Sequence, residues 1–142
     1  MAMTMHVEIV SAESEIYTGT VEALFAPAVD GEVGIMPRHT PLLTQLKPGE
    51  VRVIKQGGEE EFYFVSGGML EVQPHIVTVL ADIAVRAKSL DEAAARQAKK
   101  RAEQAMEDRV SGKEYATAEA ELAQAVAQLQ TIQRLRQRKG HG

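Results

Sequence analysis

The sequence predicts an α+β fold, in which an N-terminal antiparallel β-sandwich is followed by a C-terminal antiparallel two-helix hairpin. All five prolines, eight of the eleven glycines and five of the six aromatic residues precede Ser89, whereas twelve alanines follow it. Apolar residues recur with a period of two before this boundary and with a helical period after it. We therefore expect two domains, residues 1–88 and residues 89–142.

The first domain is predicted to contain many short strands. Apolar and polar residues alternate at 5–9 and 21–25, which predicts that Val21, Ala23 and Phe25 face inward. A similar alternation at 51–55 puts Val51 and Val53 inward. Many short strands joined by frequent turns are typical of a β-sandwich.

Glycine and proline mark the predicted turns of this domain. Gln56-Gly57-Gly58 predicts a hairpin between strands at 51–55 and 61–66, and the acidic run 59–61 is interpreted as its solvated end. Gly67-Gly68 is expected to begin another strand. Pro74-His75 is expected to turn that strand into a last one at 76–80.

The second domain is predicted to contain two helices. Ser89-Leu-Asp-Glu92 has the pattern of a capping box, with Ser89 as the N-cap of a helix from about 90 to 108. Val110-Ser-Gly112 interrupts the helical pattern, and a second helix is expected from about 114 to 136. A short connection favours an antiparallel pair.

The two helices offer unequal apolar faces. The second has Leu122, Ala125, Leu129 and Ile132 at helical spacing, with Val126 and Leu135 beside them. The first offers mainly alanines, namely Ala94, Ala98, Ala102 and Ala105. Since each buried methylene contributes only about 0.8 kcal/mol, the hairpin is either marginally held and detachable or simply fixed, and the sequence leaves both open.

Composition limits the classes of function. The net charge of −4 divides into −6 before residue 89 and +2 after it, which does not resemble the concentrated basic face of a nucleic-acid binder. There is no cysteine, hence no disulfide or thiolate metal site. The N-terminus resembles neither a signal nor a transit peptide, and no apolar run spans a bilayer, so membrane association is expected only through a partner.

Candidate catalytic and metal-binding residues are few. The histidines are scattered singly, so no metal site is predicted. His39 lacks a nucleophile motif, and the glycine pairs lack the lysine of a phosphate-binding loop, so we expect no catalysis and no cofactor. The basic residues Arg134, Arg136, Arg138 and Lys139 suit either the helix dipole or docking to an acidic surface.

The most specific segment is residues 30–53, in which three prolines and three glycines alternate with apolar residues. Such a run predicts a stiff, shaped loop with short strand pieces that displays Glu32, Arg38 and His39. With its Gly-Glu-Val-Gly-Ile pattern at 31–35, it closely resembles the epsilon subunits of F-type ATP synthases. The resemblance extends over nearly the whole chain.

That resemblance implies a non-catalytic rotor subunit of the central stalk, which couples proton flow through the c-ring to ATP synthesis. The first domain would bind the gamma subunit and the c-ring, with Glu32, Arg38 and His39 facing the ring. The hairpin would extend toward the alpha and beta subunits and inhibit ATP hydrolysis. Its docking residues would be Leu122, Val126, Leu129, Ile132, Arg134, Arg136 and Arg138. The implied location is peripheral, on the cytoplasmic face of a bacterial inner membrane.

Some members of this family bind ATP on the folded hairpin. Their motif, Ile/Leu-Asp-x-x-Arg-Ala, corresponds here to residues 90–95, where Asp91 is present but Ala94 replaces the arginine. Arg101 matches a second basic position. We therefore expect weak ATP binding at most.

Two rival hypotheses for the function of the whole chain are a free-standing adaptor and a β-sandwich enzyme, although the sequence offers no cluster of polar residues for the latter.

Overall fold

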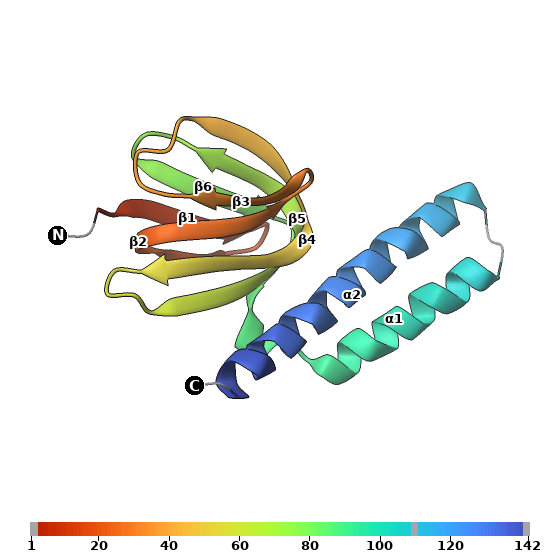
Figure 1. Cartoon of the computed structure of the whole chain (residues 1–142). Helices are drawn as coiled ribbons and strands as arrows, with labels where there is room; N and C mark the ends of the chain where they lie inside the picture. Colours follow the sequence, from red (N-terminus) through yellow and green to blue (C-terminus); the bar gives the residue numbers. More distant parts are fainter. Residues whose placement is uncertain (1–2, 109–110, 141–142) are drawn as a thin grey trace. The chain divides into compact units, whose positions relative to one another are not determined.

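The computed structural model of the protein describes residues 3–108 and 111–140 (Figure 1). The chain forms two compact units, Met1–Ala87 and Lys88–Gly142, which we call the strand unit and the helical unit. Within the described ranges the strand unit contains β1 (Met5–Ser11), β2 (Glu15–Ala28), β3 (Gly31–Ile35), β4 (Leu42–Lys55), β5 (Glu60–Val72), β6 (Ile76–Ala81) and β7 (Ala84–Arg86). A 3₁₀ turn, η1 (Ala87–Ser89), leads to α1 (Glu92–Glu107) and α2 (Gly112–Gly140).

The strands form one sheet that closes on itself. Its order is β1-β6-β5-β4-β2-β3, β1 also pairs with β2, and β7 pairs with β5. This arrangement confirms the expected β-sandwich, although the β1–β6 pair is parallel where an antiparallel one was expected. Fully buried apolar residues from facing strands fill the interior, among them Val7, Ile9, Val21, Leu24, Val51, Val53, Val65, Leu70 and Val79.

Phe25 does not face inward, contrary to the sequence-based prediction. The register of β2 against β4 runs from Val21 opposite Lys55 to Ala23 opposite Ile54, so Glu22 is an extra residue. Such a bulge shifts the alternation, and Leu24 becomes fully buried instead. The Phe25 ring lies outside, with the guanidinium of Arg52 4.3 Å from its centroid.

Gly67-Gly68 does not begin a strand, because β5 continues through both residues. Their φ angles are +107° and +138°, a region that favours glycine. A Cβ atom on Gly68 would lie 2.0 Å from the carbonyl oxygen of Leu80, so only glycine fits there. Likewise β4 continues through Pro48-Gly49, which the sequence placed in a loop.

The first helix begins later than predicted. Its N-cap is Asp91, whose carboxylate accepts a hydrogen bond from the backbone of Ala94 at 3.1 Å, whereas Ser89 ends η1. The predicted helix break falls partly outside the described residues, at Val110. The second helix already begins at Gly112, where the Ser111 hydroxyl accepts from the backbone of Glu114.

The two helices pack against each other through small residues. On α1 the fully buried residues are Ala95 and Ala102, and Ala94 is exposed, contrary to the prediction. The reason is the helical period of 3.6 residues. Ala95, Ala98 and Ala102 have spacings of three and four, so they lie on a narrower face of the helix than Ala94, Ala98 and Ala102, which have two spacings of four. No helix in the described ranges is long and apolar enough to cross a membrane.

Candidate functional site

The turn after β3 holds two of the three predicted loop residues. The backbone N–H of His39 donates to the carbonyl of Met36 at 3.1 Å, so Met36–His39 is a closed β-turn. Pro37 occupies its second position and Arg38, with a φ of +69°, its third, which is the pattern of a type II turn. The turn therefore holds Arg38 on a fixed backbone with an exposed side chain.

The predicted loop residues lie on two different elements. Glu32 lies on β3 itself, opposite Pro27 of β2, and is exposed. The half-buried His39 ring places its Nδ1 2.7 Å from the carbonyl oxygen of Thr40. These contacts fix His39 locally and give it no partner for acid–base chemistry.

An exposed apolar face, which the sequence analysis missed, covers β4, β5 and β6. Met69 on β5 lies opposite Leu80 on β6, and Leu43 on β4 lies diagonally across from Met69. These side chains are 37%, 51% and 64% exposed, respectively. We call them the β4–β6 apolar face. Leucine at an outward position of a strand was the signal that could have revealed it.

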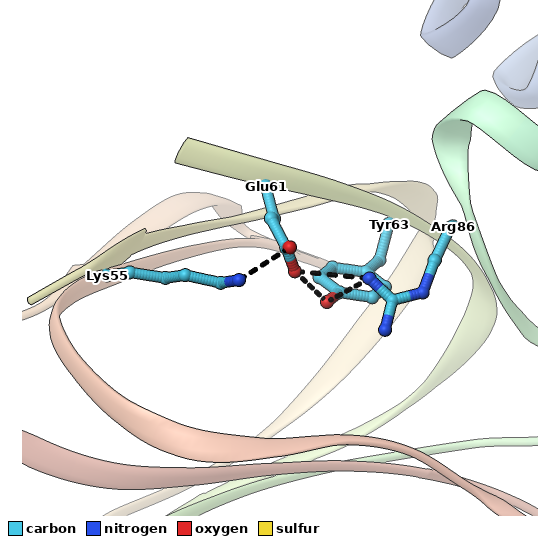
Figure 2. Close-up of polar contacts among 4 residues, drawn as sticks. All are labelled: Lys55, Glu61, Tyr63 and Arg86. Carbon is cyan, nitrogen blue, oxygen red and sulfur yellow. Dashed lines mark hydrogen bonds and ion pairs between the residues drawn. The ribbon is translucent and has the colours of Figure 1, made fainter. Parts of the chain in front are cut away.

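Glu61 is the centre of a second feature, a polar cluster of side chains from β4, β5 and β7. One carboxylate oxygen accepts from the Lys55 ammonium at 2.6 Å, and the other accepts from the Tyr63 hydroxyl. The Arg86 guanidinium lies 3.3 Å from that second oxygen (Figure 2). The sequence-based interpretation of residues 59–61 as a solvated end is therefore wrong for Glu61.

Charge and burial act together in this cluster. Burial raises the pKa of the Glu61 carboxyl, but hydrogen bonds from Lys55 and Tyr63 outweigh it and lower the pKa below its usual value. Burial and the hydrogen bond to Glu61 raise the pKa of the Tyr63 phenol. The hydrogen bond to Glu61 also raises the pKa of Lys55. The cluster therefore retains its charges at neutral pH.

Arg86 connects the cluster to the last strand of the strand unit. Arg86 is the last residue of β7, and η1 follows immediately. The sequence analysis did not predict β7, whose three residues pair with Tyr63, Phe64 and Val65 of β5. The cluster thus fixes the last strand in place directly before the connection to the helical unit.

The two candidate nucleotide-binding residues lie apart, one at the N-cap of α1 and one within the helix. The Asp91 carboxylate is engaged as the helix cap. Arg101 lines a shallow groove of about 320 Å³ between α1 and α2, together with Glu121, Gln124 and Gln128. Ten residues separate Asp91 from Arg101, which is about 15 Å along a helix axis. The structure does not bring them into one site.

The basic end of α2 has a specific partner. Arg136 donates to a carboxylate oxygen of Glu92, whose other oxygen accepts from Arg96 at 2.7 Å. These hydrogen bonds, that from Arg136 first, lower the pKa of Glu92. Of the docking residues, Leu122, Val126 and Leu129 are half-buried, Ile132 is buried, and Arg134, Arg136 and Arg138 are exposed.

Within the described part of the chain, no group of three or more His, Asp or Glu residues could hold a metal ion. What the described surface offers is an exposed apolar face, a fixed charged turn and a hairpin packed through alanines. This combination is typical of a protein that acts through contacts with partner proteins.

Comparison with known proteins identifies the family. The beta-sandwich domain of the ATP synthase delta/epsilon chain matches residues 4–87, and the long alpha-helix domain matches residues 88–133. The ATP synthase epsilon chain of Nitrosococcus oceani is 66% identical over 99% of this chain and 100% of its own. That of Alkalilimnicola ehrlichii is 61% identical over 95% and 96%. The chain therefore belongs to the ATP synthase delta/epsilon chain family.

Solved structures share the fold. A chain of the Euglena gracilis mitochondrial ATP synthase matches with a TM-score of 0.78 and 21% identity, covering 87% of this chain and 78% of its own. A chain from the central stalk and c-ring of the Tetrahymena thermophila enzyme matches with a TM-score of 0.64 and 13% identity, covering 92% and 97%.

Proposed function

We propose that this chain is the epsilon-type subunit of a bacterial F-type ATP synthase and part of its central stalk. The observation that carries this proposal is the 66% identity to an epsilon chain over nearly the full length of both proteins. In this role the chain is not itself catalytic. It couples proton flow through the c-ring to ATP synthesis, and other subunits carry out the chemistry.

The strand unit serves as the coupling body. A subunit that transmits rotation has to resist deformation, and a closed sheet with a fully buried core suits this requirement. We assign Glu32, Arg38 and His39 to contact with the c-ring. We assign the β4–β6 apolar face to the gamma subunit, since exposed apolar patches usually mark protein interfaces.

The helical unit serves as a brake on ATP hydrolysis. On α1 only Ala95 and Ala102 are fully buried, and each alanine methyl contributes about 0.8 kcal/mol, so the hairpin is weakly held by apolar contacts. Separation of the two helices would expose Leu122, Leu129 and Ile132 for contact with the alpha and beta subunits. A nearly complete switch needs about 5.5 kcal/mol of preference for one state, which burial of α2 between subunits could supply.

This role places the chain at the cytoplasmic face of the bacterial inner membrane, held there by the complex. The membrane contact is indirect, through the c-ring. No nucleic-acid partner is proposed, because the strand unit is acidic.

The experiment is ATP hydrolysis by the catalytic head, reconstituted with the full chain or with a chain ending at Lys88. A several-fold increase on truncation is expected for a brake. Unchanged hydrolysis with both forms bound to gamma would remove the regulatory role and keep the coupling role. If neither form bound gamma, a free-standing adaptor would be the better hypothesis.

A further inference from the structure

A shallow pocket in the strand unit lies where four segments far apart in the sequence meet. Its volume is about 430 Å³, and its polar lining residues come from the start of β1, from β2, from the turn after β3 and from the turn before β6. They are Thr4, His6, Thr20, Arg38 and His75. The register explains their convergence, since His6 of β1 lies opposite both Thr20 of β2 and Ile76 of β6, the residue after His75.

The pocket is basic in an acidic domain. Residues 1–88 contain six lysines and arginines against twelve acidic residues. Nevertheless, the described residues that line the pocket include one arginine, two histidines and no carboxylate. The carboxylate of Glu8 lies 3.8 Å from Nε2 of His6, and none of the ion pairs among the described residues involves Arg38. Arg38 therefore lines the pocket without an ion pair to another described residue.

The backbone at Arg38 is unusual for an arginine. It is the one residue other than glycine with a positive φ in the described part of the chain. The third position of a type II turn strongly favours glycine, because a Cβ atom is strained there. Backbone strain of this kind clusters at functional sites. A glycine would relieve the strain here, but it would not provide the charged side chain of an arginine.

We propose that this pocket binds a phosphate group, carried either by a soluble phosphate ester or by an anionic phospholipid. In the isolated chain, where the c-ring proposed to contact the same residue is absent, Arg38 is the principal ligand. His75, the two threonine hydroxyls and Nδ1 of His6 supply further donors, since Nε2 of His6 lies 3.1 Å from the Thr18 hydroxyl. Donors from several segments suit the tetrahedral oxygens of phosphate better than the two coplanar oxygens of a carboxylate. Two methionines and two prolines also line the pocket and suit the carbon part of an ester.

The test uses the isolated full chain, labelled for NMR and titrated with inorganic phosphate at constant ionic strength. The resonances of His6, Thr20 and His75 should shift together. Arg38→Gly should weaken the Kd at least tenfold while the Tm stays equal or rises, because glycine relieves the turn. Lys47→Gln, which removes a positive charge from an exposed position on β4, is the matched control and should leave the Kd unchanged.

Three results would overturn the proposal: an unchanged Kd in Arg38→Gly, an equal loss in Lys47→Gln, or equally strong shifts with acetate. A second arm separates the two sources of phosphate. If the chain sediments with phosphatidylglycerol vesicles but not with phosphatidylcholine vesicles, and Arg38→Gly abolishes this sedimentation, the result supports a phospholipid. Phosphate binding without sedimentation would support a soluble ester. Neither arm involves ATP synthase activity, so failure here leaves the rotor role untouched.

Discussion

Arg136, near the end of α2, donates a hydrogen bond to Glu92 in the first turn of α1, 44 residues earlier in the sequence. The pair closes the end of the hairpin that is opposite the connection between the helices. Arg96 binds the same carboxylate from the next turn of α1. Arg136, which the family resemblance assigned to docking, is thus already hydrogen-bonded to Glu92 in the folded hairpin. The hairpin can open only if this contact breaks.

Glu92→Gln should therefore loosen the hairpin. The amide loses the charge that Arg136 and Arg96 share, so amide hydrogen exchange along α1 should become several-fold faster. In the reconstituted enzyme, inhibition of ATP hydrolysis should become stronger, since the open hairpin is the proposed inhibitory form. Glu103→Gln, at an exposed site on the same helix, is the control. Unchanged exchange in Glu92→Gln would show that Arg136 does not hold the hairpin.

Acid should weaken the strand unit through Glu61. Its pKa in the folded protein is lowered, so its stabilising effect is present above the usual carboxyl pKa and is lost as the pH falls through the lowered value. Glu61→Gln should cost about 2 kcal/mol at pH 7, because three donors lose a charged partner, and this cost should shrink in acid. Urea titrations at pH 7 and pH 3 test this.

Glu60→Gln is the matched control for that measurement. Glu60 pairs with Arg52 at 3.0 Å in a more exposed position, and such surface pairs contribute about 0.2–1 kcal/mol. An equal loss in both variants would show that the contacts around Glu61 add nothing beyond a surface ion pair.

Gly68→Ala should be severely destabilising. The new methyl would meet the Leu80 carbonyl, in backbone that pairs with β4 at Gly68 and with β6 at the next residue, so we expect a loss of about 3 kcal/mol or more. Gly57→Ala shares the positive φ but has open space around it, so its cost should be about 1 kcal/mol. Thermal unfolding of both variants measures the difference, and equal losses would mean that strain in φ dominates.

Leu80→Asn should weaken binding to the gamma subunit. Leu80 is half exposed on the β4–β6 apolar face, so the change should leave the core intact and reduce affinity about tenfold, which is about 1.4 kcal/mol. Val29→Asn makes a similar change at an exposed apolar residue after β2 and should have little effect. Calorimetric titration of gamma decides between them, and full affinity in Leu80→Asn would move the interface elsewhere.

ATP should bind the hairpin weakly or not at all, because Asp91 caps the helix and Ala94 cannot contact a phosphate. Ala94→Arg should restore about one to two decades of affinity, since Ala94 is exposed and an arginine fits without repacking. Ala93→Arg adds the same charge at the adjacent exposed position and is the control. Micromolar binding by the unmodified chain in titration calorimetry would contradict this prediction.

Local patterns in the sequence were enough to predict a strand-rich part followed by two helices, and most of the strands, whereas the structure divides the chain between Ala87 and Lys88. A run of alanines without glycine or proline favours a helix wherever it lies, and alternation at Val51 and Val53 favours a strand. The segment at 30–53 carried the family resemblance, which the comparisons confirm. These features depend on neighbours within a few residues, so the sequence determines them directly.

Only the tertiary structure decided which residues meet. The inward position of Leu24 depends on a bulge at Glu22, and the continuity of β5 depends on how closely Gly68 approaches Leu80. The partners of Glu61 and Glu92 come from β4, β7 and α2, and the pocket proposed to bind phosphate joins four separate segments. Strand register and the closing of the sheet set these contacts, and neither can be deduced from periodicity within a single segment.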